Sequence, residues 1–476
     1  MRTKVPGFLI PSGVLMLAAL VLAGWRLGSQ SLWLDETYTW WFTRLHWPDL
    51  LQAVRIDAVN PPLYYIYVRL FSPSGSEAAL RLPSVVAHVA GTAGAIWLGL
   101  HLGGRAGGFA AGLLWATHPM TLWAARDARP YALAAALAVV LVAVFVQLRD
   151  SWSTGLAVAA GAAMALGLIT HYFFFVAVAS LSLLAAADLR HSPTFFRRWT
   201  LLTLAAMAPL ALWVVWLLRT GSPSLGIGWI RTPLLSDLPL TLWNLAGGYA
   251  GVVDLPSTLL GLAILASIVL GLRIHGRAAW SLLVGGLLAP ALAVWVISQR
   301  RPVYVDRYFI VLLPFVAALV ALGAAALDRW IRQRGSPPAA LIVVAAIVCG
   351  IALAGAIPVH LAAKFDKEDW RGLAVFLQSR GVASDSLSLS ESEITLPLSY
   401  YFDQERMDEG FQRIPACGRE CWWISRQPYT ATHALTQFVR EGRDLTLPAL
   451  PVGCREDDAW VSGTGVSAIH VVCSSP

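Results

Sequence analysis

The stretch YALAAALAVVLVAVFVQL, residues 131–148, decides the fold class of this chain. It is almost continuously apolar and is about as long as a helix must be to cross the hydrocarbon core of a bilayer. It lacks the alternation of polar and apolar residues that is typical of a membrane-barrel strand. Similar runs recur up to about residue 360, and the whole chain is 57% hydrophobic and only 13% charged. With a mean hydropathy of +0.62, the sequence predicts an all-α polytopic membrane protein.

The apolar runs predict about eleven transmembrane helices. Their expected positions are near residues 8–26, 80–101, 107–124, 131–148, 154–170, 172–187, 200–218, 256–272, 279–298, 308–327 and 339–360. The first run has no clean cleavage site before SLWLDE, so we interpret it as a retained anchor and not as a signal peptide. Basic residues recur on alternate sides of successive runs, which predicts a cytoplasmic N-terminus and an outer tail. The net charge of +7 mainly reflects this bias, and we expect no nucleic-acid partner.

The chain divides at about residue 360. Residues 1–360 form the predicted membrane domain, with long outer loops at 28–79 and 219–255. The first loop is rich in Trp, Tyr and Pro, which is typical of short amphipathic helices along a membrane face. The second is rich in Gly, Pro and Ser, which predicts a mobile loop that closes as a lid. The shortage of lysine against arginine favours a bacterial source, so we expect the bacterial inner membrane.

Residues 361–476 differ in composition, since they hold 16 of the 28 acidic residues. KFDKEDWRGLAVFLQSRG predicts a helix, and runs such as GVSAIHVVC predict strands, so we expect a small α/β domain outside the membrane. Such a domain is placed to select the acceptor. An even number of cysteines outside the cell favours two disulfides, and the simplest of three pairings joins Cys417 to Cys421 and Cys454 to Cys473. A zinc site is the alternative, although no close second CxxC pair supports it.

Acidic side chains on the outer side locate the candidate chemistry. SLWLDETYTWW, residues 31–41, places Asp35 and Glu36 among aromatic residues, which stack on sugars and also mark membrane interfaces. A carboxylate placed here can take the proton of an acceptor hydroxyl. DAVNPPLYYIYVRLF, residues 57–71, adds Asp57 to the same side. Solvated acids in an interfacial loop are the alternative interpretation of both segments.

Arginines on the outer side break the positive-inside pattern at two places. ARDARPYAL, residues 125–133, carries Arg126 and Arg129, and SQRRPVYVDRYFI carries Arg301 and Arg307. Because guanidinium groups bind phosphate oxygens in a forked geometry, these four are candidate donor-phosphate ligands. Snorkelling at the interface is the alternative. The candidate substrate contacts, including the outer turn THYFFFV, are Trp33, Tyr38, Asn60, Tyr64, Tyr131, His171, Tyr172 and Tyr308.

These segments, taken in order, resemble family 39 of the GT-C glycosyltransferases, which includes protein O-mannosyltransferases and bacterial lipid A aminoarabinose transferases. LWLDETYT, NPPLYYIYVRLF, ARPYAL, THYFFF and DRYFIVLLP carry the resemblance across the membrane domain. It implies transfer of a sugar from a polyprenyl-phosphate carrier to an acceptor hydroxyl, with inversion, on the outer face. It gives Asp35 the role of base, with Glu36 assisting and Asp57 as a second acid. Many relatives have His where this chain has Asn60, which weakens any metal or proton role there.

The sequence therefore predicts a membrane glycosyltransferase that moves a monosaccharide. The expected partners are the polyprenyl-phosphate sugar, an envelope glycan, lipid or protein acceptor, and the bilayer. No dedicated metal-ligand cluster is evident, and a divalent metal remains an option for neutralising the leaving phosphate. The alternatives are a lipid-linked oligosaccharide ligase or polymerase, and a polytopic transporter or flippase. Transporters usually place ionisable groups near mid-membrane, whereas here they lie at the outer boundary.

Overall fold

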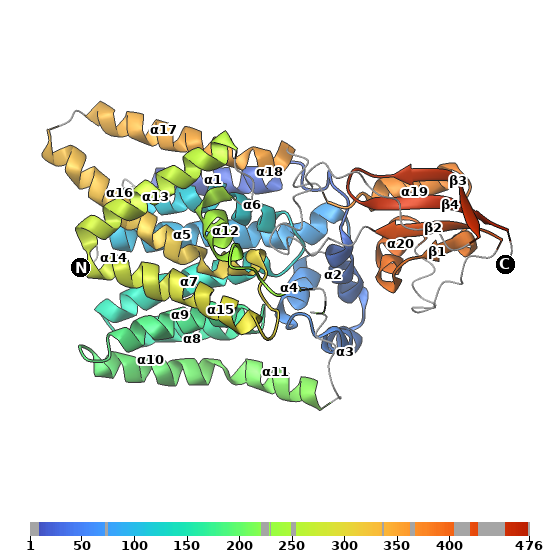
Figure 1. Ribbon diagram of the computed structural model, residues 1–476. Coiled ribbons are helices and arrows are strands. Elements are labelled where there is room, and N and C mark those ends of the chain that lie inside the picture. The colour runs from blue at the N-terminus through green and yellow to red at the C-terminus, as the bar shows by residue number, and fades with distance from the viewer. Residues whose placement is uncertain are drawn as a thin grey trace.

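The molecule consists of a helical bundle and a small sheet domain, with short helices between them (Figure 1). The computed structural model describes residues 9–71, 75–219, 228, 230–248, 254–335, 338–361, 367–403, 419–426 and 453–474. The N-terminal end and the C-terminal end lie at opposite ends of the molecule (Figure 1). The all-α polytopic membrane fold with a small C-terminal domain, predicted from the apolar runs, is confirmed.

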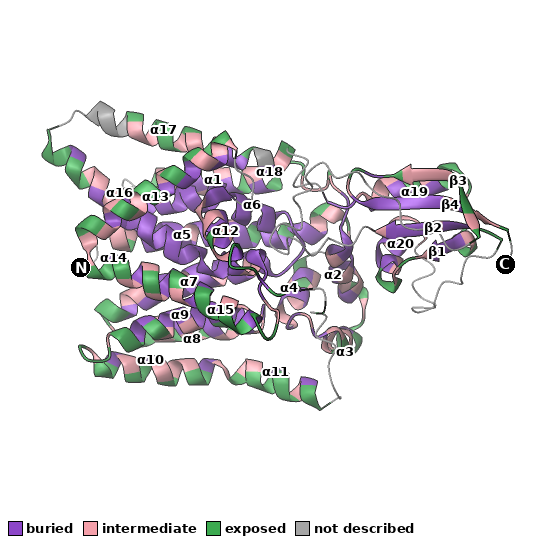
Figure 2. Cartoon of the chain, viewed as in Figure 1, coloured by how far each residue is buried: buried purple, intermediate pink, exposed green. Residues whose placement is uncertain are grey.

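Three helices form the centre of the bundle. They are α5 (Glu77–Thr117), α7 (Tyr131–Asp150) and α16 (Leu313–Gln333), which pack against one another, while α1 (Leu9–Gly24) packs against α5 and is largely exposed elsewhere. Their facing side chains are largely Ala, Val and Leu, so the helices approach closely. Figure 2 shows this centre as buried, whereas the outlying α10 (Pro193–Ala206), α11 (Ala208–Leu218) and α17 (Pro338–Ala356) expose much of their surface. Leucine and valine side chains cover these exposed faces, as expected for helices that contact lipid.

Two of the expected spans, 80–101 and 107–124, meet within α5 as a helical hairpin. The backbone leaves the helical conformation at Gly103 and Gly104, and Gly104 has a φ of +60°. This φ favours glycine because it has no Cβ. The two arms then touch backbone to backbone, since a Cβ added to Gly99 would lie 2.3 Å from the carbonyl oxygen of Gly107. Glycine is therefore required both to turn the chain and to pack the arms.

The remaining helices complete the bundle. They are α6 (Pro119–Ala125), α8 (Thr154–Leu168), α9 (Phe174–Ala187), α13 (Leu255–His275), α14 (Arg277–Ser281), η4 (Leu282–Leu288), α15 (Ala289–Ser298), the 3₁₀ turn η5 (Asp306–Leu312) and α18 (Pro358–Leu361). Each of the eleven expected spans falls on a helix. Within the described residues, seven helical segments are long and apolar enough to cross a membrane, counting the α5 hairpin once, and three are shorter. The number of crossings stays a prediction.

The first long outer loop folds as three short helices. They are α2 (Leu34–Arg44), α3 (Trp47–Asp57) and α4 (Leu63–Phe71), which lie between the bundle and the sheet domain (Figure 1). The Asn60-Pro61-Pro62 turn separates α3 from α4, as proline disfavours helix at the preceding residue. In the second long loop, the structure describes α12 (Asp237–Trp243) and a π-helical turn, Asn244–Gly248. Most of the segment expected to form a lid lies outside the described residues.

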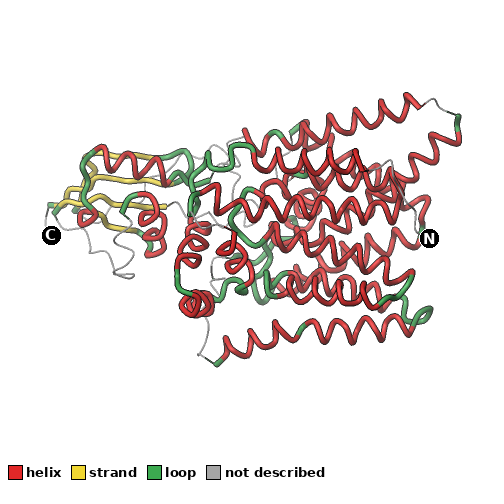
Figure 3. Tube along the Cα trace, turned by 180° about the vertical axis from the view of Figure 1, so that it is seen from behind, coloured by secondary structure: helices red, strands yellow, loops and turns green. Residues whose placement is uncertain are grey.

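The C-terminal domain is an α/β unit, as predicted. Its sheet has the order β1-β2-β4-β3, with β1 (Leu387–Leu389) parallel to β2 (Glu420–Arg426) and the other pairs antiparallel. Strands β3 (Cys454–Val461) and β4 (Val466–Cys473) form its hairpin, and Figure 3 shows the sheet apart from the helical bundle. Two further helices, α19 (Trp370–Ser379) and α20 (Thr395–Tyr401), complete the domain.

The first helix of this domain is shorter than the sequence predicted. Expected from Lys364 onward, it begins only at Trp370, where Asp369 Oδ1 accepts a hydrogen bond from the Gly372 amide at 2.9 Å. This side-chain cap satisfies an otherwise unpaired amide at the helix start. Lys367 and Glu368 therefore precede the helix. Both are buried, and both contact residues of the membrane domain.

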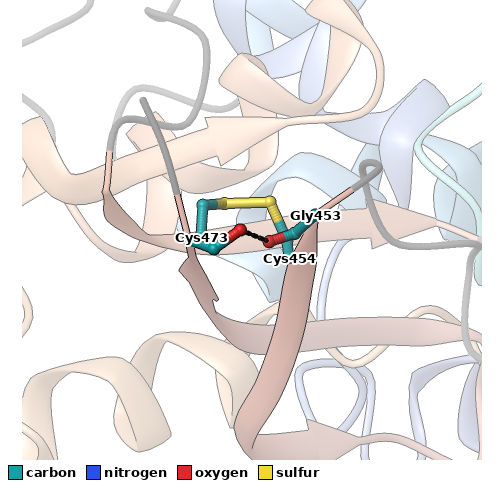
Figure 4. The surroundings of a disulfide bond; sticks show 4 residues. Gly453, Cys454 and Cys473 are labelled. Carbon is teal, nitrogen blue, oxygen red and sulfur yellow. Dashed lines mark hydrogen bonds between the residues drawn. A yellow bond between two sulfur atoms is a disulfide. The ribbon is translucent and has the colours of Figure 1, made fainter.

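A disulfide joins Cys454 to Cys473 at the end of the β3–β4 hairpin (Figure 4). The two cysteines are register partners, and beside them Ser474 Oγ donates to the Gly453 carbonyl oxygen at 2.9 Å. This half of the predicted pairing is confirmed. Cys421 is also disulfide-bonded, and Cys417 lies outside the described residues.

Candidate active site

The candidate site centres on the carboxylate of Asp35 in the first turn of α2. Arg129, in the turn between α6 and α7, places Nη2 3.8 Å from Asp35 Oδ2, and Arg307 of η5 places Nη2 3.9 Å from the same oxygen. The two guanidinium side chains are 6% and 4% exposed, whereas Asp35 is 27% exposed. The distances exceed those of charge-assisted hydrogen bonds. Two buried cations thus form long ion pairs with one partly exposed carboxylate, and Arg129 Nη1 also donates to the Asp35 carbonyl oxygen at 3.2 Å.

Aromatic rings surround Arg307. Its guanidinium carbon lies 5.8 Å from the Trp33 ring centre and 5.6 Å from those of Tyr131 and Tyr308, and its Nε donates to the Tyr131 hydroxyl at 2.9 Å. The His171 ring lies 4.9 Å from that of Tyr308. Burial, together with the charges of the two arginines, lowers the pKa of His171 to about 3. The imidazole is therefore neutral at physiological pH. Trp33, Tyr131, Tyr308 and His171 thus form an aromatic wall around the Arg307 cation.

Asp57 ends α3 on another side of the site. Burial raises its pKa to about 6 against the opposing charge of Arg129, and the nearby Asp35 carboxylate also raises it. The Tyr65 hydroxyl accepts a hydrogen bond from Arg129 Nη1 at 3.5 Å and is also hydrogen-bonded to Asn60. Burial and the charges of Asp57 and Asp35 likewise raise the pKa of Tyr38. The structure therefore brings Asp35, Asp57 and Tyr38 from the first long loop to one place.

Glu36 lies elsewhere, although it is the next residue after Asp35. Its side chain is fully buried, with Oε2 2.6 Å from Arg81 Nη2 and Oε1 2.9 Å from Lys367 Nζ. Oε1 also accepts hydrogen bonds from Arg81 Nε at 2.7 Å and from the Ala128 amide at 2.8 Å. Burial raises its pKa, but the cations outweigh this and lower the pKa to about 2. We therefore revise the expected catalytic assistance by Glu36, because its oxygens already bind protein groups.

Asp127 joins this ion network to the aromatic wall. Its Oδ1 accepts hydrogen bonds from Lys367 Nζ at 3.0 Å and from Trp33 Nε1 at 2.8 Å. Trp33 in turn faces Arg307. The side chains of Glu36, Asp127, Arg81 and Lys367 thus pair two carboxylates with two cations beneath the site. We call these four residues the buried ion network.

The two other arginines expected to bind phosphate have different surroundings. Arg126 donates to the carbonyl oxygens of Ala23, Trp25 and Arg26, where it satisfies the C-terminal end of α1. Arg301 is exposed just beyond α15. Within the described residues, neither forms an ion pair or hydrogen bond with Asp35. The sequence could not separate them from Arg129 and Arg307, because all four lie next to the ends of predicted spans.

Two expected substrate contacts are engaged in packing. The Tyr64 hydroxyl is hydrogen-bonded to Ser84 Oγ at 2.9 Å and is fully buried. The Tyr172 hydroxyl accepts a hydrogen bond from Trp213 Nε1 at 2.9 Å. Tyr64 therefore holds α4 against α5, whereas Tyr172 joins the start of α9 to α11 and its contact with substrate stays a prediction.

Sequence reasoning missed Arg81, Lys367 and Glu368, which are all buried. A signal was available for the first two. Arg81 lies at the start of an apolar run, where a charge requires a partner, and Lys367 is one of only three lysines. Glu368 carries no comparable signal, since the tail holds many acids.

The side chains that could bind a metal ion are not grouped in a way that indicates a metal site. Within the part of the chain that the structure describes, no three His, Cys, Asp or Glu side chains are arranged to hold a metal ion. At Asp35, the neighbouring positive charges of Arg129 and Arg307 oppose the entry of a further cation. We therefore derive no step through a metal.

The helical bundle and the small C-terminal domain match the fold of two transferases of known structure. The structure is similar to that of ArnT from Cupriavidus metallidurans in the apo state, at a TM-score of 0.57 and 13% identity over 98% of each chain. Comparison with the same enzyme bound to undecaprenyl phosphate gives a TM-score of 0.57 and 12% identity, again over 98% of each chain.

The Archaeoglobus fulgidus oligosaccharyltransferase in complex with Zn and sulfate gives a TM-score of 0.50 and 12% identity, over 87% of this chain and 68% of the other. No family model and no curated protein matches the sequence. At these identities the likeness shows the fold, and the GT-C fold predicted from the sequence motifs is confirmed.

Proposed function

We propose that this chain is a membrane glycosyltransferase that moves a monosaccharide from a polyprenyl-phosphate carrier to an acceptor hydroxyl on the outer face of the bacterial inner membrane. The observation that carries the proposal is the approach of Arg129 and Arg307 to the accessible Asp35 carboxylate at 3.8 and 3.9 Å. A base and two anion-binding cations in one place suit the transfer of a sugar from a phosphate. The likeness to a fold solved with undecaprenyl phosphate supports this carrier class.

The reaction is a single inverting displacement. The acceptor oxygen attacks the anomeric carbon, and the bond from that carbon to the carrier phosphate oxygen breaks. The polyprenyl phosphate leaves with the bonding electron pair, while the acceptor proton passes to the Asp35 carboxylate. Arg129 and Arg307 stabilise the charge that grows on the phosphate oxygens, and they do so strongly because they are nearly excluded from water. The partly exposed Tyr308 supplies a flat surface for the sugar ring, and the buried Trp33 and Tyr131 support Arg307 behind it.

Asp57 is the second acid of this site. Its pKa of about 6 lies close to a working pH near neutrality, where a carboxylate is an effective proton acceptor. We place it on the acceptor side, where it accepts a hydrogen bond from the acceptor or takes over the proton. The N-terminus lies in the cytoplasm in this proposal, and the C-terminal domain lies outside with the acceptor.

The test uses the purified chain in lipid nanodiscs, a panel of radiolabelled polyprenyl-phosphate sugars, and an envelope extract. We expect wild type to transfer label from one donor, and Asp35→Asn to lower the rate by about 100-fold or more. Asp49→Asn is the matched control, since Asp49 is exposed on α3. Full activity in a folded Asp35→Asn variant would overturn the assignment of the base.

Two outcomes would favour the alternative functions. Use of only lipid-linked oligosaccharide would indicate a ligase or polymerase. Movement of solute or lipid across the bilayer without donor consumption would indicate a transporter or flippase. Either result would overturn the proposed monosaccharide transfer.

A further inference from the structure

The start of α2 is held by groups from the C-terminal domain. The Leu32 amide donates to the Tyr401 hydroxyl at 2.6 Å, and the Leu34 amide donates to Glu368 Oε2 at 3.0 Å. Amides at the start of a helix have no partner within the helix and need one from elsewhere. One contact at the helix start is local, since Glu36 Oε2 accepts a hydrogen bond from the Trp33 amide at 3.3 Å. The Leu34 amide, which is the first of the helix, and the Leu32 amide just before it are instead satisfied by residues more than 300 positions along the chain.

Glu368 is itself fixed on several sides. Its Oε2 also accepts a hydrogen bond from Trp370 Nε1 at 2.8 Å, its Oε1 lies 3.4 Å from Arg426 Nη1 of β2, and its carbonyl oxygen accepts one from Ser31 Oγ at 2.6 Å. The Glu368 side chain is 0% exposed. A carboxylate held by both a helix and a strand of the C-terminal domain therefore fixes the α2 backbone relative to that domain.

Lys367 makes a second connection beside the first. Its Nζ lies 2.9 Å from Glu36 Oε1 and 3.0 Å from Asp127 Oδ1, and donates to the Arg126 carbonyl oxygen at 3.0 Å. These acceptors belong to α2 and to the turn that precedes α7. Lys367 thus ties the helix that carries Asp35 to the turn that carries Arg129.

We propose that the C-terminal domain positions Asp35 for catalysis, with Glu368, Tyr401 and Lys367 as its positioning residues. This inference rests on the proposed function. Asp35 follows Leu34 directly, so a shift of the Leu34 backbone displaces the carboxylate relative to Arg129 and Arg307. A misplacement of about 1 Å is enough to lower a rate by about 100-fold. The domain therefore acts on the chemical step, whether or not it also contacts the acceptor.

The first test replaces Tyr401 by Phe, which removes one oxygen atom and keeps the ring. Tyr400→Phe is the matched control, because the Tyr400 hydroxyl donates to the Gly75 carbonyl oxygen at 3.0 Å and not to the start of α2. We expect Tyr401→Phe to lower kcat by about tenfold, with KM for the donor changed by less than about twofold. An unstable domain would instead lower the thermal midpoint, which is measured in parallel.

The second test is Glu368→Gln. A glutamine has one carbonyl oxygen and cannot serve both the two donors at Oε2 and Arg426 at Oε1. We expect a similar loss in kcat. Amide hydrogen exchange across residues 31–41 gives a readout that needs no substrate, and we expect exchange to be about tenfold faster in both variants than in Tyr400→Phe.

The outcomes separate this inference from the proposed function. Equal kcat and equal exchange in Tyr401→Phe, Glu368→Gln and Tyr400→Phe would overturn the positioning role. If wild type transferred no sugar but exchange rose in both variants, the proposed function would fail and the capping contact would stand without a catalytic role. Loss of kcat with unchanged exchange would also overturn the inference, since the effect would not pass through α2.

Discussion

The guanidinium of Arg307 faces the Asp35 carboxylate across 3.9 Å, measured from Nη2 to Oδ2. Arg307 is 4% exposed, and its Nε is held by the Tyr131 hydroxyl. We expect Arg307→Gln to lower kcat/KM for the polyprenyl-phosphate sugar by about 100-fold or more, since a neutral amide cannot stabilise the leaving phosphate. The measurements are the steady-state rate of sugar transfer and the affinity of the variant for polyprenyl phosphate. Arg44→Gln, at the exposed end of α2, is the control, and equal rates in both variants would contradict the role of Arg307.

The pH dependence should follow Asp57. Its folded-state pKa is raised from 3.8 to about 6, so the carboxylate loses its charge as the pH falls through 6. We expect the transfer rate to fall with it, with a midpoint near pH 6, and Asp57→Asn to remove this limb of the profile. The sign for stability is opposite, because a raised carboxyl pKa favours the folded state at low pH and this contribution is lost as the pH rises through 6. An unchanged limb in Asp57→Asn would assign it to another group.

Removing Lys367 should destabilise the junction between the domains. Lys367 is 3% exposed and pairs with two fully buried carboxylates. Loss of one member of a buried ion pair costs about 3–5 kcal/mol, because the partner charge stays buried and unpaired. We expect Lys367→Met to lower the thermal midpoint clearly. Arg371→Met serves as the comparison, since the Arg371–Glu77 pair is 40% and 19% exposed, and a similar shift in both would contradict the expected difference.

The disulfide should support activity as well as the domain. Cys454 and Cys473 are 19 residues apart in sequence, and closing a loop of this size stabilises the folded state by about 3 kcal/mol. We expect Cys454→Ser with Cys473→Ser to unfold the C-terminal domain at a lower temperature and to reduce transfer over the same range. Cys349→Ser is the control, because Cys349 is a free cysteine within α17. Unfolding of the domain without loss of transfer would contradict the coupling.

A chain that ends at residue 361 should lose transfer to every acceptor. It lacks Lys367, Glu368 and Tyr401, so the amides of Leu32 and Leu34 lose their hydrogen-bond partners. Selection of the acceptor by the tail, which its outer location suggested, predicts instead a change in preference at a retained rate. Transfer assays with several acceptors separate the two, provided that thermal unfolding shows an intact bundle.

The apolar runs determined the architecture without any structure. Hydrocarbon leaves a spanning chain few options, so continuous hydrophobicity is sufficient to locate helices. The same reasoning placed Asp35, Asp57, Arg129 and Arg307 on one side, and the structure groups them at one site. The number of crossings and the lid, which the same reasoning predicted, stay predictions.

Only the tertiary structure decided which of two adjacent side chains faces the site. Asp35 and Glu36 are neighbours in sequence, but successive residues of a helix point about 100° apart, so packing of α2 directs one to the site and the other to Arg81. Arg126 and Arg129 are separated by the turn between α6 and α7, which directs one to the end of α1 and the other to Asp35.

The contacts of Lys367 and Glu368 also depend on the folded structure. Their partners are distant in sequence, and no local pattern encodes a contact between a tail and a first loop. Hydrophobicity is a property of each segment alone, whereas the position of a charge in a site depends on the packing of every segment around it. The sequence therefore determined the membrane fold and the side on which the chemistry lies, and the tertiary structure decided which charges act together.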